Sequence, residues 1–261
     1  MRPVCDRTPD RTALLLPVLL WLSVWPGVTS TLAAGALSPD ELLRRADATR
    51  RVVEEGSIRI RATVEVPGAE PVVSDLEVLV KGEDHALCIF REGPFAGRKI
   101  LIARDRVWLL IPGTSRPIPV SANQRLLGGA SIADVARLRL AAEFSAAERP
   151  EEEPLDGTLC RALDLKARTP KASYAGGTLW VGSGDGLPRR ARFTLPSGKE
   201  AKEVLFSLYG HAGGRTVLKR MEIFHLLPSE RGMKTILDFI DHETRTLEPG
   251  LFDPSGARER P

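Results

Sequence analysis

Apolar and polar residues alternate with a period of two along most of the chain, a pattern typical of half-buried β-strands. In residues 57–66, apolar side chains take every second position and polar or charged side chains take the others. Further strands are predicted at residues 75–81, 85–90, 99–103, 107–111, 157–166, 178–181, 187–195, 203–209, 217–227 and 235–246, with a short stretch around Ile118 and Val120. Turn sequences such as Pro67-Gly68 separate these segments. The pattern therefore predicts about eleven short strands in an antiparallel sheet.

Two segments have helical spacing instead. Ser38-Pro39-Asp40-Glu41 combines a capping box with a proline at the first helical position, so we expect a helix to begin here and to end at Gly56. In residues 131–144, apolar side chains recur every three or four positions, which predicts a second helix. Residues 148–154 are strongly charged and are expected to form a loop.

These elements imply a curved sheet with helical caps. Antiparallel sheets twist, and beyond about ten strands they tend to curl or close. The apolar face would then line a concavity that the two helices can cover. We therefore expect a mainly β chain with some α, folded as an incomplete, half-open antiparallel β-barrel of about eleven strands capped by helices. No linker or change of composition interrupts residues 37–261, so we expect a single domain there.

The first 36 residues resemble a cleavable export signal. Arginines precede an apolar run of about a dozen residues, shorter than the roughly 20 that cross a bilayer. Leu32-Ala33-Ala34-Gly35 resembles the lead-in to a bacterial lipoprotein cleavage site, but the next residue is Ala36 and not the cysteine that would carry the lipid. An uncleaved membrane anchor is the alternative interpretation. We expect residues 1–36 to be removed and the mature protein to lie in the periplasm without a lipid anchor.

Composition excludes several other classes of protein. The net charge is only +3, and the basic residues are scattered along the strands, so nothing indicates a nucleic-acid partner. Cys88 and Cys160 remain after cleavage; the compartment permits a disulfide, but each lies in an apolar stretch that favours a separate buried thiol.

No motif indicates catalysis, a metal or a cofactor. The four histidines are spread over different predicted strands without the short spacing of a metal site. The loop of residues 182–186 lacks the Lys-Ser/Thr end of a phosphate-binding loop and is expected to be a turn between strands. Asp238 and Asp241 beside His242 have no obvious nucleophile. We expect no enzyme activity, no metal and no cofactor.

The order of several motifs resembles one known family. Residues 97–102 and 105–112 resemble a strand, a turn and a Trp-bearing strand that ends in proline, and residues 128–135 resemble a Gly/Ser loop leading into a short acidic helix. In the second half, residues 179–190 and 196–203 resemble a second Trp strand and a Gly-Lys hairpin. Together they resemble the periplasmic lipoprotein-carrier superfamily (LolA/LolB-like), in particular its outer-membrane lipoprotein-sorting branch.

The resemblance implies a soluble carrier that holds the acyl chains of lipoproteins or related lipids in an apolar cavity during transfer to the outer membrane. An inner-membrane transporter and an outer-membrane acceptor would be its partners. The residues expected to line the cavity are Ile60, Val64, Leu76, Val78, Val80, Trp108, Leu110, Trp180, Phe193 and Phe206, and those of a lid helix are Ile132, Val135 and Leu138. The aromatic residues could equally fill an ordinary β core.

Two other functions fit the same pattern. A module of the same fold could sense lipoproteins or envelope stress without transporting anything. A hydrolase of envelope lipids would need a Ser/His/Asp cluster assembled from distant residues. Bound lipid would favour the carrier. A filled interior would favour the sensor, and an assembled Ser/His/Asp cluster would favour the hydrolase.

Overall fold

The structure is a computed structural model that describes residues 37–259 except 51–52, 115, 122–123, 128–129, 133 and 136–138. Contacts divide the chain into Met1–Ala36 and Leu37–Pro261, and every described residue belongs to the second unit. The predicted export signal therefore lies outside the described residues. No helix in the described ranges is long and apolar enough to cross a membrane.

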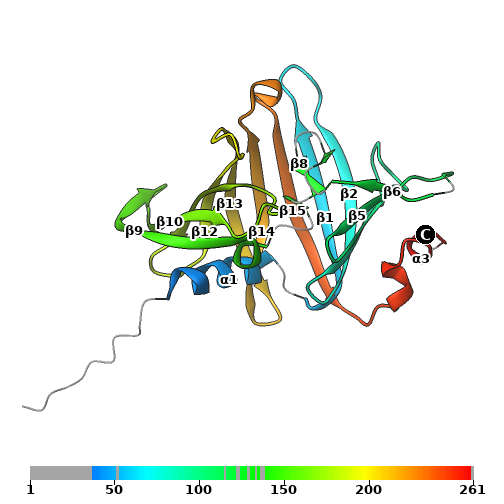
Figure 1. The fold of residues 1–261 in the computed structure, drawn as a ribbon, viewed down its shortest axis with the longest axis horizontal. Helices are drawn as coiled ribbons and strands as arrows, with labels where there is room; N and C mark the ends of the chain where they lie inside the picture. Colours follow the sequence, from blue (N-terminus) through cyan, green and yellow to red (C-terminus); the bar gives the residue numbers. More distant parts are fainter. Residues whose placement is uncertain are drawn as a thin grey trace, which may run out of the picture. The chain divides into compact units, whose positions relative to one another are not determined.

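A thirteen-stranded antiparallel sheet dominates the described residues (Figure 1). Its strands are β1 Glu55–Glu65, β2 Val72–Lys81, β3 His85–Phe90, β4 Lys99–Ala103, β5 Arg106–Leu110, β6 Ile118–Val120, β9 Phe144–Leu155, β10 Thr158–Ala167, β11 Gly176–Gly182, β12 Pro188–Thr194, β13 Glu200–Ala212, β14 Arg215–His225 and β15 Lys234–Thr244. Consecutive strands pair within β1–β6 and within β9–β15, and β1 pairs with β15 to join the two runs. The sheet ends at β6 and β9, which do not pair with each other, so it is not closed. This confirms the predicted fold class, a half-open antiparallel β-barrel.

The main sheet has more strands than the alternation pattern predicted. The extra long strand is β9, whose acidic residues 148–154 were expected to form a loop. Arg149 and Arg161 stabilise it through ion pairs with Asp164 at 2.8 Å and with Glu148. These cross-strand charges replace the apolar alternation, so the strand has no apolar pattern in the sequence.

The second predicted helix is confirmed in part: among the described residues of 131–144, Ile132, Asp134, Val135 and Leu140–Glu143 are helical. Residues Arg125–Leu127 form strand β7 and Ala130–Ser131 form β8, which pair as a small separate sheet. Helix α2 is limited to Leu140–Glu143, and Phe144 already begins β9. This short helix is stabilised by Asp47 of α1, which accepts two of its backbone N–H groups.

The first helix begins where the sequence predicts. Helix α1 spans Pro39–Arg50, and the backbone N–H of Ser38 donates to Glu41 Oε2 at 2.7 Å, as expected of a capping box. The Ser38 hydroxyl donates to the same oxygen at 2.6 Å, and together with this N–H it lowers the pKa of Glu41. Gly56, however, does not end the helix but lies in β1. A Cβ there would be 2.0 Å from the carbonyl oxygen of Glu243 on β15, so close backbone approach explains the glycine.

The main hydrophobic core lies on one face of the sheet, here called the inner face. Alternate residues of β1, β2, β3 and β4 contribute to it, and Leu42, Leu43 and Ala46 of α1 pack in the same cluster. Cys88 of β3 belongs to this core, and Cys160 is buried on β10. Both thiols are free, as two separate buried cysteines.

The opposite, outer face of β2–β5 is also apolar. Leu79, Leu87, Ile89, Leu101 and Leu110 form a second core cluster there. The C-terminal segment, residues 245–257, covers this cluster with Leu247, Phe252 and Ala257, and includes the turn η3 Pro249–Phe252. The ammonium groups of Lys81 and Lys99 hold this segment by donating to the carbonyls of Leu247 (2.8 Å) and Ala257 (2.9 Å). Apolar residues on both faces explain the nearly continuous apolar sequence of β3.

Candidate functional site

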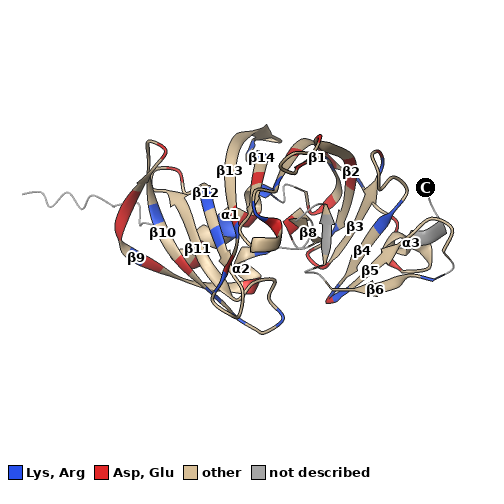
Figure 2. Ribbon diagram, turned by 90° about the horizontal axis from the view of Figure 1, so that it is seen from above, with Lys and Arg blue, Asp and Glu red and all other residues tan. Residues whose placement is uncertain are grey.

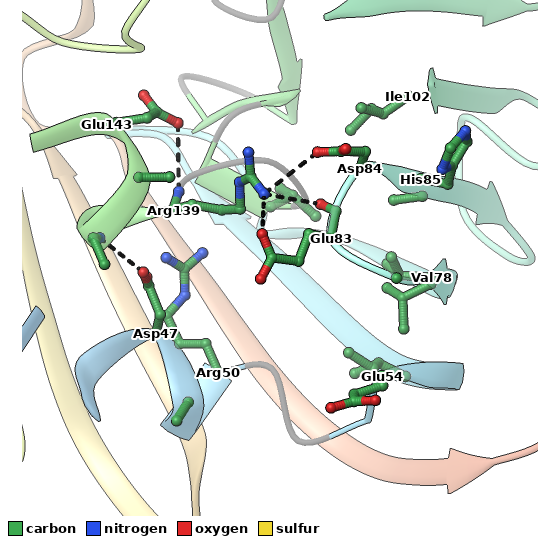
Figure 3. A pocket seen from close by; sticks show the side chains of 18 of the residues that line it. Asp47, Arg50, Glu54, Val78, Glu83, Asp84, His85, Ile102, Arg139 and Glu143 are labelled. Carbon is green, nitrogen blue, oxygen red and sulfur yellow. Dashed lines mark hydrogen bonds and ion pairs between the residues drawn. The ribbon is translucent and has the colours of Figure 1, made fainter. Parts of the chain in front are cut away.

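A pocket of about 910 Å³ opens on the inner face of the sheet (Figure 3). Its floor consists of buried apolar side chains, each at most 6% exposed. These are Val53, Ile58, Ile60, Val78, Val80, Ala86, Ile102, Val135 and Phe239. Because most come from alternate positions of β1–β4, the period-two pattern of the sequence builds this floor directly.

The rim of the pocket is charged and exposed to solvent. Arg139, just before α2, forms ion pairs with Glu83 at 3.1 Å and Asp84 at 3.5 Å in the turn between β2 and β3 (Figure 3). Lys171, in the loop between β10 and β11, pairs with Asp105 in the turn between β4 and β5 at 3.5 Å. Each pair links a turn among strands β2–β5 to a segment from the C-terminal half of the chain beside the pocket. Exposed ion pairs contribute about 0–1 kcal/mol each, so these contacts can exchange partners at little cost.

Asp47 of α1 anchors the wall made by α2. Its carboxylate accepts the backbone N–H groups of Leu140 at 2.8 Å and Ala141 at 2.9 Å (Figure 3). Burial raises the pKa of Asp47, although these two amides oppose the increase. The carboxylate satisfies N–H groups that begin a helix too short to be stable alone.

A buried polar cluster holds Ser131 and Asp134 against the sheet. Asp134 is ion-paired with Lys202 of β13 and accepts the Tyr174 hydroxyl hydrogen at 2.6 Å and the Ser131 N–H at 2.7 Å. Burial alone would raise the pKa of Asp134, but the Lys202 ammonium and these donors outweigh it and lower that pKa. The Arg50 guanidinium also donates to the Asp134 carbonyl at 3.1 Å. The cluster therefore positions Val135, which lines the pocket.

The residues predicted to line a cavity divide into several groups. Ile60, Val78 and Val80 line the pocket, as does Val135 of the predicted lid. Members of the same core that lie outside the pocket lining are Val64, Leu76, Phe193, Phe206 and Ile132. Leu138 lies outside the described residues. Of the predicted lid, the structure describes Ile132 and Val135, which are helical and follow directly after β8.

Trp108, Leu110 and Trp180 do not reach the pocket, contrary to expectation. In β5, Val107 and Leu109 contact the inner core, so alternation places Trp108 and Leu110 on the outer face. Trp180 of β11 lies outside both clusters, and its indole N–H donates to Glu153 Oε2 at 2.9 Å. The alternation pattern correctly placed Trp108 and Leu110 on the same face of β5, but it assigned that face to the inner side of the sheet when it is the outer side.

Sequence reasoning missed the rim. Between the strands predicted at 75–81 and 85–90 the sequence indicates no more than a turn, and it gives Arg139 no role. Glu83 and Arg139 are separated by 56 positions, so only the folded chain brings them together. A turn of Gly-Glu-Asp beside a predicted apolar strand was the one available indication.

The described residues contain no group of three or more His, Cys, Asp and Glu side chains that could hold a metal. His85 borders the pocket, but its ring packs edge-on against Phe252 of the outer cluster with 5.8 Å between ring centroids. His225 is buried, with its Nε2 3.2 Å from the Thr235 hydroxyl oxygen. The arrangement is therefore suited to holding an apolar group beneath a charged rim.

Comparisons with known proteins support the fold. A family model described as "Uncharacterized protein" matches residues 82–256. A search of curated proteins found no match.

Three solved structures share the fold. A LolA superfamily protein from Nitrosomonas europaea has 23% identity and a TM-score of 0.76, with 84% of this chain and 99% of that chain covered. A DUF1329 family protein from Desulfovibrio piger has 19% identity and a TM-score of 0.72, with 85% and 98% covered. A domain assigned to the outer membrane lipoprotein-sorting proteins of Vibrio parahaemolyticus has 15% identity and a TM-score of 0.70, with 86% and 100% covered. The chain belongs to the family whose model matches residues 82–256, and it has the fold of LolA superfamily proteins.

Proposed function

We propose that this protein is a carrier that shields the acyl chains of lipoproteins or related lipids in the inner-face pocket during transfer to the outer membrane. The observation that carries the proposal is the pocket itself, about 910 Å³ with an entirely apolar, buried floor. Pockets for small ligands usually enclose about 300–1,000 Å³ and have mainly apolar walls. The pocket is large enough for an acyl chain, and its buried floor is apolar beneath a charged rim.

The energetics favour a protein that covers the chain. Each exposed CH₂ group costs about 0.8 kcal/mol in water, so a long acyl chain does not leave a membrane unaided at a useful rate. The apolar floor offsets this cost, while the weak ion pairs of the rim leave the pocket open to exchange.

The setting follows from the export signal proposed for residues 1–36. Ala36 in place of a cysteine supports a periplasmic protein without a lipid anchor. An inner-membrane transporter would deliver the lipid and an outer-membrane acceptor would receive it. The chain would bind and release without chemical conversion.

A pair of matched substitutions tests the proposal. Val80 and Val64 are both 6% exposed and belong to one core, but Val80 lines the pocket and Val64 does not. Val80→Asp places a carboxylate against the bound chain, where it still has access to solvent. Val64→Asp buries the same group in packed surroundings, which costs much more stability.

We expect Val80→Asp to lose lipid binding while it remains folded, and Val64→Asp to lose mainly stability. Native mass spectrometry and solvent extraction measure the bound lipid, and urea unfolding measures stability. If either Asp variant does not fold, Val→Thr at the same two positions preserves side-chain shape and repeats the comparison. Wild type that neither carries nor can be loaded with lipid would overturn the carrier and favour a sensor of the same fold.

A further inference from the structure

The acidic side chains around the pocket are largely engaged within the protein. Asp47 accepts two backbone N–H groups of α2, and Glu143 accepts the Ser173 N–H at 2.6 Å. Glu83 and Asp105 contact the cations Arg139 and Lys171. These acids therefore have little remaining capacity to bind an external cation.

The cationic side chains are more available. Arg44 of α1 and Arg104 of the turn after β4 line the pocket, are exposed and form no ion pair with any described residue. The Arg104 N–H donates to the Asp84 carbonyl at 2.8 Å, which places this arginine beside the rim acids. The carboxylates that pair with Arg139 and Lys171 are exposed, Glu83 being 84% and Asp105 63% exposed, although Arg139 also donates to the Glu83 carbonyl at 3.3 Å. An anion at the rim can recruit these two cations by exchange.

From this arrangement we propose that the pocket selects amphiphiles with an anionic head, a carboxylate or a phosphate, over those with an uncharged head. The inference rests on the proposed function, since the apolar floor must hold the chain. A charged head cannot enter the floor without losing its hydration, so it remains at the rim when the chain is bound. There it meets Arg44, Arg104 and the exchangeable Arg139 and Lys171. Guanidinium groups bind carboxylate and phosphate through paired hydrogen bonds.

One residue opposes this selection. Glu54 lines the pocket and forms no ion pair with any described residue. A head of positive charge would be drawn to it. The test must therefore compare both signs of charge with a neutral head.

The experiment uses the delipidated protein and four probes with the same chain: dodecanoate, dodecyl phosphate, dodecanol and dodecyltrimethylammonium. Each displaces an apolar fluorescent dye from the pocket, and the displacement gives a Kd at low and high salt. We expect both anions to bind more tightly than dodecanol, and only their advantage to shrink with added salt. Tighter binding of dodecyl phosphate points to a phospholipid-type head, and tighter binding of dodecanoate to a free fatty acid.

Substitutions locate the effect. Arg44→Gln lies on an exposed helix face, and Arg104→Asn suits the φ of +57° at that position, since asparagine tolerates this conformation. Each is expected to weaken the anionic probes up to about five-fold, with dodecanol unchanged. Arg215→Gln, in an exposed position at the start of β14 away from the pocket lining, removes the same charge as a control.

Equal Kd values for dodecanoate and dodecanol would overturn the selection while leaving the carrier function intact. Tighter binding of dodecyltrimethylammonium than of dodecanoate would also overturn the selection. So would a loss of affinity for the anionic probes in Arg215→Gln that equals the loss in the Arg44 and Arg104 variants. Failure of every probe to displace the dye would overturn both the selection and the carrier function.

Discussion

Replacing Lys202 with methionine removes the only ammonium group paired with Asp134 among the described residues. The two side chains are 8% and 3% exposed, so the pair is buried. Methionine preserves most of the aliphatic stem, so the change is mainly electrostatic. Loss of one partner from a buried ion pair typically costs about 3–5 kcal/mol, because the remaining charge is left without compensation. Ordinary domains have only about 5–15 kcal/mol of stability, so the loss should be easy to measure.

The pH dependence of that loss has a definite sign. In the wild type, the pKa of Asp134 is lowered, so its contribution to stability is present above the ordinary value of about 3.9 and disappears as the pH falls through the lower, folded pKa. In Lys202→Met, the ammonium group that opposes the effect of burial is gone, so we expect the pKa of Asp134 in the folded protein to rise above its ordinary value. The carboxylate then destabilises the protein increasingly as the pH rises. The difference between wild type and variant should therefore be larger at pH 8 than at pH 5.

Urea unfolding at both pH values, followed by circular dichroism, measures the difference. The double variant Lys202→Met/Asp134→Asn removes the isolated charge, keeps the shape, and should recover most of the stability. A double-mutant cycle then isolates the coupling between the two residues. A loss below about 1 kcal/mol, or a loss that does not change with pH, would refute the reasoning.

Three further changes test other parts of the fold. Gly56→Ala forces a Cβ against the Glu243 carbonyl and should cost more than about 2 kcal/mol in urea unfolding, whereas Gly184→Ala, with open space around it and no positive φ, should cost about 1 kcal/mol or less. Truncation after residue 244 should uncover the outer core cluster, increase binding of a hydrophobic dye and lower Tm; an unchanged Tm would show that the C-terminal segment contributes nothing. Burial raises the pKa of Cys88 to about 12, so the folded protein should resist alkylation at pH 8 until denaturant is added, and rapid labelling of the native state would contradict its placement.

Alternation in the sequence was sufficient to predict the antiparallel sheet and most of its strands. It also identified three floor residues, Ile60, Val78 and Val80. Alternation shows which residues share a face, but it does not show which face points inward. Where both faces are apolar, as in β5, the choice failed, and Trp108 and Leu110 were assigned to the wrong side.

The rest of the site depends on contacts between distant segments. The outer cluster needs the C-terminal segment to cover it, and no local pattern in β2–β5 indicates a cover. The rim needs Arg139 to meet the turn at Glu83 and Asp84. Asp134 meets Lys202 from 68 positions away, and a single charged residue between apolar neighbours resembles a solvent-exposed position in the sequence.

An open sheet leaves two strands with unpaired backbone groups, and β9 is the longer of them. Such an edge invites a strand from a second molecule, which is the usual route to aggregation. Along β9, Pro150 and Pro154 lack the N–H that an added strand would need, and Glu151 and Glu152 are exposed. Figure 2 shows the acidic colouring of this strand. Two copies approaching edge to edge would bring like charges together and leave hydrogen bonds unmade. The prolines and glutamates of β9 interrupt the apolar alternation, which is why the pattern did not predict this strand. The same residues therefore protect the open barrel against self-association.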